Sequence, residues 1–160
     1  FINLGIKNDI TRNMIANVNW SLGGFSSSSI YSNQVYQYER GTNVYSGRKI
    51  NWTGKVALMY LSDYGYATDF NNCNKMLNAY NDVGCTSNNW LFVNGYYFHL
   101  LSPNSNFSDL VWGINYTGRS STDGYTCSNA ISVRPVLYLK NDISKFDGDG
   151  SKNNPYRIKL

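Results

Sequence analysis

Short apolar runs separated by turn-forming residues are the feature of this sequence that most limits its fold. The clearest case is Asn94-Gly95, which stands between the apolar residues 90–93 and the run 96–101. Asn and Gly both tolerate the positive φ angles of a tight turn, so the pair predicts a β-hairpin. Three more runs have the length of strands and turn residues beside them: residues 55–61, 110–116 and 131–140. The chain is therefore expected to be rich in antiparallel β-structure.

Two segments have the periodicity of a helix. In residues 9–18 an apolar stripe predicts a short helix with Asp9 as its N-cap, and the stripe is formed by Ile10, Met14, Ile15 and Val18. Residues 73–81 predict a second short helix. By contrast, residues 35–46 alternate apolar and polar side chains, which predicts two extended arms, and residues 62–69 have turn chemistry. The expected fold class is α+β, mostly antiparallel β-sheet with two short helices.

The expected core consists of apolar residues on the inward side of these elements. Its predicted members are Ile15, Trp20, Val56, Leu58, Tyr60, Trp90, Phe92, Leu100, Val111, Trp112, Val133, Val136 and Leu137. A chain of 160 residues is long enough to bury such a core without a metal or several disulfides. We therefore expect a single domain over residues 1–160.

Charge and hydropathy exclude two classes of partner. The net charge is only +4, and the 14 Lys and Arg residues are scattered. A nucleic-acid interface needs clustered basic residues to neutralise phosphates, so nucleic acid is not an expected partner. No apolar run approaches the ~20 residues that a membrane helix needs. Contact with a membrane is therefore expected only through an anchor upstream of Phe1.

The cysteines indicate the compartment. Cys73 and Cys85 flank a short segment rich in loop residues, and Cys127 is left over. The chain has one histidine and no CxxC pair, which are too few ligands for a typical metal site. We favour a disulfide between Cys73 and Cys85 over free thiols, which predicts an oxidising, extracellular location.

Few residues have the chemistry of a catalytic site. His99 is the single histidine, and it lies in an alternating run where packing or a local hydrogen bond is the expected role. Asp63 and Asp69 flank an aromatic turn, where Asp usually accepts hydrogen bonds from backbone amides. A hydrolase acting on cell-wall sugar or peptide would use Asp63, Asp69 or His99, and it is the second alternative to a binding function. The chain is predicted not to be an enzyme.

The segment from Asp147 to Ser151 begins like a calcium-binding loop. It lacks Gly at the sixth position, and Ile158 stands where the twelfth-position Glu belongs. A hairpin turn is the favoured interpretation, and a weak calcium site at Asp147 and Asp149 is the alternative. No other cofactor is expected.

Loops rich in Tyr, Ser, Gly and Asn have the composition that binding surfaces use. Tyr offers a rigid amphipathic contact, and the small polar residues offer adaptable hydrogen bonds. Residues 63–72 and 118–129 have this character, although ordinary polar loops share it. The predicted ligand contacts are Tyr64, Tyr66, Asp69, Asn71, Arg119, Asp123 and Tyr125.

Several segments resemble a recurring surface module of low-GC Gram-positive bacteria. The segments are NWSLGG, the run from Tyr38 to Thr68, CTSNNWLF, HLLSPNS, VRPVLYLK and GDGSKNNPY, and the resemblance covers residues 14–160. In those proteins the module commonly follows a prepilin-type anchor or another secretion anchor. The resemblance therefore implies a location at the cell surface.

The order of predicted elements also resembles a C-type-lectin-like fold. Relatives of formylglycine-generating enzymes and the variable proteins of retroelements end in a similar strand with an arginine, which Arg134 matches. The catalytic cysteines and metal ligands of the enzymatic relatives have no match here, so the resemblance implies a scaffold and not an activity. The predicted function is adhesion to a protein or glycan, on a host or another cell surface. A pilin-like structural subunit is the first alternative.

Overall fold

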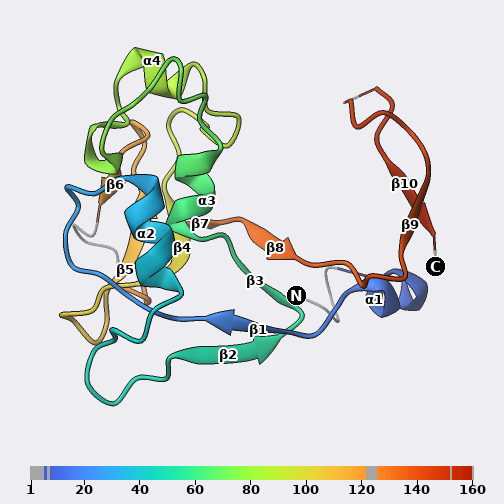
Figure 1. The fold of residues 1–160 in the computed structure, drawn as a ribbon, viewed down its shortest axis with the longest axis horizontal. Coiled ribbons are helices and arrows are strands. Elements are labelled where there is room, and N and C mark those ends of the chain that lie inside the picture. The colour runs from blue at the N-terminus through green and yellow to red at the C-terminus, as the bar shows by residue number, and fades with distance from the viewer. Residues whose placement is uncertain (1–5, 7, 122–125, 152, 160) are drawn as a thin grey trace. The chain divides into compact units, whose positions relative to one another are not determined.

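The computed structural model describes residues 6, 8–121, 126–151 and 153–159. The fold is mixed α+β, with mostly antiparallel sheets and short helices, as the sequence predicts (Figure 1). By its internal contacts the chain divides into two compact units. The smaller unit comprises Phe1–Val18, Thr53–Val56 and Leu137–Leu160, and the larger comprises Asn19–Trp52 and Ala57–Val136. The single domain over residues 1–160 that the sequence predicts stays a prediction.

The larger unit contains a four-stranded sheet with short helices. The sheet has the order β6-β5-β4-β7, from Ser120–Ser121, Val111–Ile114, Phe98–Pro103 and Ser132–Val133. Strand β4 pairs antiparallel with β5 and parallel with β7. The helices are α2 Ser32–Glu39, α3 Leu61–Tyr66, the 3-10 helix η1 Leu77–Ala79 and α4 Val83–Thr86.

The smaller unit is built from a short helix and a hairpin. Helix α1 is Asp9–Met14, and the hairpin pairs β9 Ser144–Asp147 with β10 Arg157–Lys159. The hairpin turn expected for the segment from Asp147 to Ser151 is present, and Gly148 and Gly150 adopt φ angles of +88° and +86°. Four strands contain residues of both units. They form the pair β1 Val18–Ser21 with β2 Asn51–Gly54, and the pair β3 Val56–Leu58 with β8 Pro135–Leu137.

The apolar core lies in the larger unit. Trp112 stacks on Phe25 with ring centroids 4.6 Å apart, and its indole Nε1 donates to the Phe25 carbonyl oxygen over 3.1 Å. The predicted disulfide between Cys73 and Cys85 is present, and both cysteines are buried in this core. Cys127 is free and exposed. The disulfide therefore crosslinks the larger unit from within its apolar interior.

Part of the predicted core is wrong. Ile15, Trp20, Tyr60, Leu100 and Trp112 are buried as expected. Five others are half-buried, namely Val56, Leu58, Phe92, Val111 and Val136. Trp90, Val133 and Leu137 are exposed. In β3 the error is one of parity, because the strand buries Ala57 between the half-buried Val56 and Leu58.

Two segments predicted as arms and a turn are helices. Within residues 35–46, α2 buries Val35 and Glu39, which lie one helical turn apart. The Gln34 side chain accepts a hydrogen bond from the Tyr31 amide over 3.1 Å and so satisfies the start of this helix. Asp63 does the same for α3 by accepting from the Tyr60 amide over 2.9 Å. The predicted turn at residues 62–69 is thus mostly helix α3.

Other predicted elements are shorter or displaced. Helix α1 ends at Met14, and its N-cap is Asn8 in place of Asp9, because the Asn8 side chain accepts from the amides of Ile10 and Thr11. The second predicted helix, 73–81, contains only the 3-10 turn η1.

The predicted hairpin at Asn94-Gly95 is only half present. Gly95 has a φ of +83°, as the turn requires, and the strand after it begins at Phe98. Residues 90–93 form no strand, so β4 pairs with β5 and β7 instead. The last predicted strand, 131–140, is interrupted at Arg134, and Pro135 opens β8.

Every helix that the structure describes is too short or too polar to traverse a lipid bilayer.

Candidate binding surface

The first of two large hollows in the larger unit lies beside Trp90. This Trp90 hollow has a volume of about 560 Å³, within the range of small-molecule binding sites. Its walls come from α3, the loop after α4 and the segment around β8. It is lined by Met59, Asp63, Tyr66, Ala67, Trp90, Leu91, Arg134, Pro135 and Val136.

The backbone of Trp90 is held in place by a buried asparagine. Asn89 donates through Nδ2 to the Tyr64 carbonyl oxygen over 2.9 Å and to Thr68 Oγ1 over 2.7 Å. Its Oδ1 accepts from the Leu91 amide over 2.9 Å, and the Trp90 amide donates to the Ala67 carbonyl oxygen over 3.3 Å. The loop is thus fastened to α3 and the residues directly after it through Asn89 and the Trp90 amide, which orders this wall of the hollow.

Two side chains of opposite charge line the same hollow. Asp63 is exposed, and one carboxylate oxygen accepts from the Tyr60 amide. Partial loss of water around this carboxylate raises the pKa of Asp63, against the opposing effects of that amide and the Arg40 charge. Arg134 lies 4.3 Å above the Phe98 ring and donates to the Leu91 carbonyl oxygen over 2.6 Å. Desolvation lowers the pKa of Arg134, which nevertheless stays charged.

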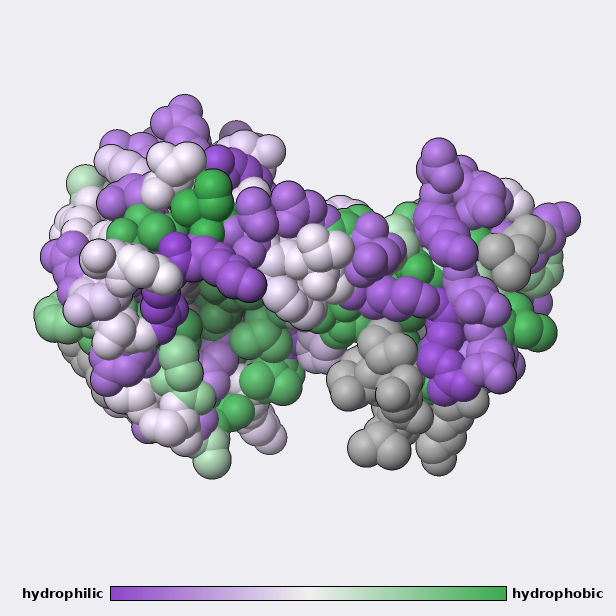
Figure 2. All heavy atoms as spheres, turned by 90° about the horizontal axis from the view of Figure 1, so that it is seen from below, coloured by the Kyte–Doolittle hydropathy of each residue, from purple (hydrophilic) through white to green (hydrophobic). Residues whose placement is uncertain are grey.

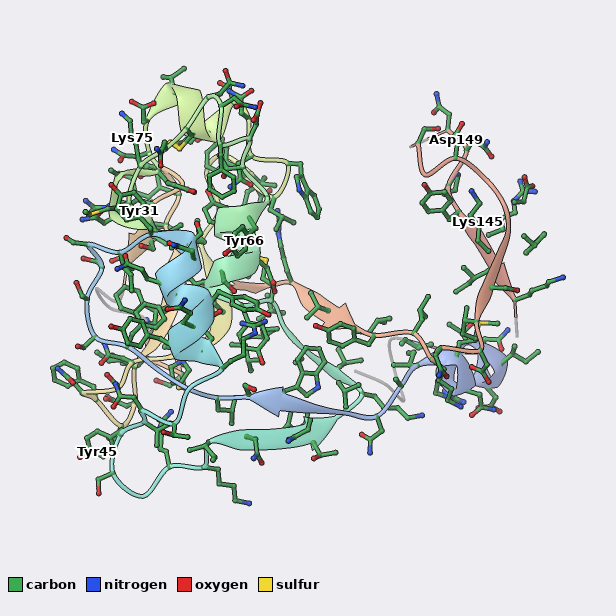
Figure 3. All side chains as sticks on the ribbon, in the orientation of Figure 1. Tyr31, Tyr45, Tyr66, Lys75, Lys145 and Asp149 are labelled. Carbon is green, nitrogen blue, oxygen red and sulfur yellow. A yellow bond between two sulfur atoms is a disulfide. The ribbon has the colours of Figure 1, made fainter. Side chains whose placement is uncertain are left out.

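The second hollow lies beside Tyr31 and has a volume of about 520 Å³. This Tyr31 hollow is lined by Tyr31, Ser32, Asn33, Gln34, Tyr66, Phe70, Asn74 and Lys75. Tyr66 lines both hollows, so the two hollows share this residue. Figure 3 shows Tyr66 on α3, with Tyr31 and Lys75 on the neighbouring segments.

Three exposed rings form an aromatic ridge, which consists of Tyr36, Tyr66 and Phe70. Tyr66 makes edge-to-face contacts with both others, at centroid distances of 6.2 Å to Tyr36 and 5.9 Å to Phe70. The Arg40 guanidinium lies 3.8 Å above the Tyr36 ring. Each of the three side chains is nearly half exposed to water, at 46% for Tyr36, 48% for Tyr66 and 46% for Phe70. The rings restrain one another, so a ligand would meet a surface that is already ordered.

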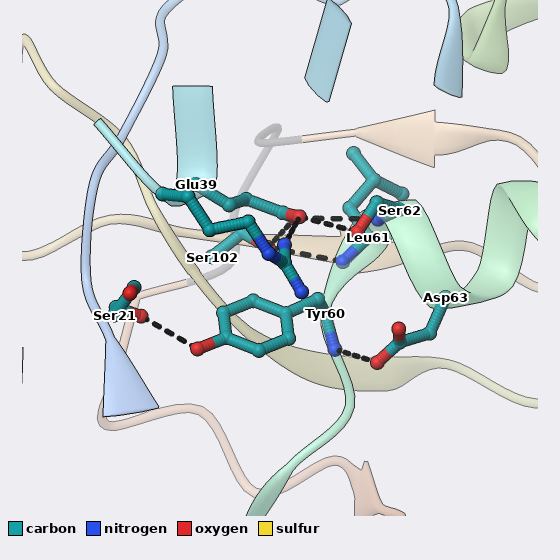
Figure 4. A network of polar contacts seen from close by, with 8 residues as sticks. Ser21, Glu39, Tyr60, Leu61, Ser62, Asp63 and Ser102 are labelled. Atoms are coloured by element: carbon teal, nitrogen blue, oxygen red, sulfur yellow. Dashed lines mark hydrogen bonds and ion pairs between the residues drawn. The ribbon is translucent and has the colours of Figure 1, made fainter. Parts of the chain in front are cut away.

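A buried carboxylate fixes the elements that bear this ridge (Figure 4). Glu39, at the end of α2, accepts hydrogen bonds from the Ser62 amide over 3.2 Å, from the Ser62 hydroxyl and from Ser102 Oγ over 2.5 Å. Ser102 Oγ in turn accepts from the Leu61 amide over 3.0 Å. The network joins α2, the first turn of α3 and β4. Burial raises the pKa of Glu39, although these hydrogen bonds and Arg40 act in the opposite direction.

The structure separates the residues that the sequence predicts as ligand contacts. Tyr66 lies at the centre of the surface just described, and Asp69 and Asn71 are exposed in the loop after α3. The prediction of Tyr64 as a ligand contact is wrong, because its ring is fully buried and its hydroxyl donates to the Gly118 carbonyl oxygen over 2.8 Å. Arg119 lines a different, polar hollow with Tyr97 and Tyr116.

Two further predicted contacts, Asp123 and Tyr125, lie outside the described residues. Sequence reasoning missed Trp90, which it placed in the core, and it missed Phe70 and Tyr36. The turn-forming pair Asn88-Asn89 directly before Trp90 was the available signal that this segment is a loop.

The residues of the hydrolase alternative have structural roles. Asp69 accepts from the Asn71 amide over 3.0 Å and from Asn72 Nδ2 over 2.6 Å, as expected of a turn. His99 is buried in β4, and its Nε2 lies 3.0 Å from the Asn129 carbonyl oxygen. Of the three residues, only Asp63 lines the Trp90 hollow.

The two candidate calcium ligands are engaged in the hairpin turn. Asp147 accepts from Arg157 Nη1 over 2.8 Å, and Asp149 accepts from the Ser151 amide over 2.9 Å. Within the described ranges, no group of three or more His, Cys, Asp or Glu side chains is placed to hold a metal ion. The hairpin interpretation of this segment is confirmed, and a calcium ion there stays a prediction.

Comparisons of this chain with known protein families, with curated proteins and with solved structures find no match in any of the three.

Proposed function

We propose that this chain is a binding module of a bacterial cell surface. It recognises a protein or glycan through the surface that surrounds Tyr66, which comprises the two hollows and the aromatic ridge. The observation that carries the proposal is that Tyr66 lines both hollows while two further exposed rings contact it.

Exposed aromatic side chains favour this function for an energetic reason. Removing apolar surface from water contributes about 25 cal/mol for each Å². The exposed rings lose this contact with water only when a ligand binds. Because they already hold one another in place, little conformational entropy is lost at that step. Tyr, Trp and Arg are the residues that dominate binding energy at interfaces, and all three occur at this surface.

The disulfide supports the proposed location. A buried crosslink between Cys73 and Cys85 is typical of proteins that fold outside the reducing cytosol. The resemblance to surface modules behind prepilin-type anchors, and to the C-type-lectin-like plan, supports the same location. We therefore place the module outside the cell, carried by an anchor that precedes this part of the protein.

The proposal is tested with Tyr66→Ala and a matched control. The immobilised chain is exposed to solubilised cell-surface proteins and to an oligosaccharide array, and bound components are quantified. Tyr66→Ala should weaken capture by about tenfold, the effect of losing a central aromatic contact. Tyr45→Ala changes an exposed tyrosine of the same unit that lines neither hollow (Figure 3) and should have no effect.

Capture that is equal in the wild type and Tyr66→Ala would contradict the proposal. So would the absence of any retained protein or oligosaccharide. Circular dichroism of both variants checks that the fold is intact, which is expected because Tyr66 and Tyr45 are exposed.

A further inference from the structure

Trp90 is exposed to an unusual degree for a tryptophan. Its side chain is 79% exposed, whereas Trp20 and Trp112 in the same unit are almost fully buried. A loop held to α3 by Asn89 presents the indole at the mouth of a hollow. Because an ordered loop keeps a large apolar ring in water, the structure leaves this face open for an occupant.

The chemistry of the Trp90 hollow combines apolar walls with isolated polar groups. Aromatic rings from Trp90 and Tyr66 line it together with Met59 and Val136. A pyranose ring has matching faces, since its C–H groups form apolar patches and its hydroxyls lie around the edge. Stacking of such a C–H face on an indole removes apolar surface from water on both partners.

The polar groups of the hollow match hydroxyls better than they match a charged ligand. Asp63 supplies a carboxylate acceptor, and Arg134 supplies guanidinium donors. No ion pair joins Asp63 to Arg134 in the part of the chain that the structure describes. The formal charges of the residues that line the hollow sum to zero, and the hollow offers hydrogen-bond acceptors as well as donors.

We infer that the Trp90 hollow is a saccharide subsite for a neutral hexopyranose or N-acetylhexosamine unit of a glycan. Trp90 and Tyr66 stack on the sugar, Asp63 accepts hydrogen bonds from its hydroxyls, and Arg134 donates to its oxygens. Asn89 acts as a positioning residue, because it fixes the loop that carries the indole. The inference rests on the proposed binding function and names the class of ligand for one of its two hollows.

Tryptophan fluorescence provides a direct test. Of the four tryptophans, Trp20 and Trp112 are buried and Trp52 is half exposed, so Trp52→Phe leaves Trp90 as the exposed emitter. In this background, neutral cello-, manno-, galacto- and chito-oligosaccharides are titrated, with acidic oligogalacturonates as the charged comparison. At least one neutral series should shift the emission to the blue and protect Trp90 from acrylamide quenching.

Variants show whether the sugar occupies this hollow, with binding measured by calorimetry. Trp90→Ala should weaken binding of the active oligosaccharide by about tenfold or more, because the stacking surface is lost. Asp63→Asn keeps an acceptor for the Tyr60 amide but loses the charge, and should weaken binding by about fivefold. Trp52→Ala removes an exposed tryptophan that does not line the hollow and should leave the affinity unchanged.

The outcomes separate this inference from the proposed function. Tighter binding of the acidic series, or equal affinity of Trp90→Ala and the wild type, would overturn the saccharide subsite. If no oligosaccharide binds but a surface protein is still captured in a Tyr66-dependent way, the subsite is wrong and the binding function stands. If neither is retained, both are wrong.

Discussion

The two compact units differ in how they hide apolar surface. The larger unit buries a continuous cluster that includes Trp112, Leu77 and the disulfide. Among the described residues of the smaller unit, Met14 and Ile15 are the buried apolar side chains, while Ile10, Phe146 and Tyr156 are exposed. Figure 2 shows green apolar patches between purple hydrophilic residues on the surface of the smaller unit, at the right of the view.

The difference indicates two sources of order. In the larger unit, burial of apolar area is the dominant favourable term. In the smaller unit, polar and turn contacts take a larger part. The hairpin has turn glycines, the Arg157–Asp147 ion pair, and Lys145 placed 4.6 Å from the Tyr156 ring centre. Backbone hydrogen bonds also join Ala16 to Tyr138 and Lys140 to Met14. Lys145 and Asp149 lie along this hairpin in Figure 3. Exposed ion pairs and cation–π contacts each contribute only about 1 kcal/mol or less.

The largest expected contrast is between two aromatic truncations. Trp112→Ala removes a fully buried ring and should lower the free energy of unfolding by about 3–5 kcal/mol. Phe146→Ala removes a ring that is 55% exposed and should change it by less than about 0.5 kcal/mol. Chemical denaturation followed by circular dichroism measures both. Equal losses would show that the smaller unit has a core of its own.

Removal of the disulfide should have the next largest effect. Cys73 and Cys85 are 12 residues apart, and the chain-entropy model assigns a crosslink of this span roughly 3 kcal/mol. The double variant Cys73→Ala/Cys85→Ala should lose about that amount in denaturant titrations. Cys127→Ala, at an exposed free cysteine, serves as the control and should match the wild type. A denaturation midpoint unaffected by the double variant would mean that the crosslink stabilises nothing.

Glu39 should make the stability of the larger unit depend on pH. Because burial raises its pKa above the ordinary 4.5, the folded protein holds this proton more tightly than the unfolded chain. The stability that the protonated group contributes is full below pH 4.5 and falls as pH rises through the folded pKa. Glu39→Gln does not titrate at this position and should therefore cost more stability at pH 4 than at pH 7.

The comparison of Glu39→Gln with the wild type isolates this group, since the other carboxyls titrate in both proteins. Denaturant titrations at several pH values measure the difference. A difference that is constant from pH 4 to pH 7, or that grows toward pH 7, would contradict the direction of the pKa shift.

Asp149 in the smaller unit should give the smallest effect, with the opposite sign. Hydrogen bonds from Ser151, first of all from its amide, lower the pKa of Asp149 below 3.8. The contribution of the carboxylate is therefore present above that value and is lost as pH falls through the folded pKa. NMR amide signals of Ser151 should show the turn loosening in acid. Asp149→Asn should abolish this pH dependence and leave the larger unit unchanged; persistence of the dependence would assign it to another group.

Several features were predictable because they depend on neighbouring residues alone. The Asp-Gly turns of the hairpin follow from the freedom of glycine at positive φ, seen at Gly148 and Gly150. Strand β5 follows from its apolar run, and the disulfide was predicted from a short, loop-like spacing. The burial of Ile15 and Trp112 follows from their size and apolar character.

The binding surface could not be predicted in this way. Its key residue Tyr66 was a candidate from composition, but its neighbour Tyr64 looks the same in the sequence and is buried. Residues 35–46 alternate as a strand would, yet α2 forms there because Val35 and Glu39 find partners in distant parts of the chain. The Glu39 carboxylate, for example, accepts hydrogen bonds from Ser62 and Ser102, which are 23 and 63 residues away in the sequence.

The sequence by itself indicated the Asp-Gly turns of the hairpin, favoured the pairing of Cys73 with Cys85, and predicted that the fold mixes short helices with antiparallel strands. Only the tertiary structure decided which aromatic rings face water. Trp90 has the apolar neighbours of a core residue, but hydrogen bonds from Asn89 to Tyr64 and Thr68, more than 20 positions earlier, hold its loop outside the sheet. Such contacts join residues that the linear pattern does not relate, so they appear only when the chain is folded.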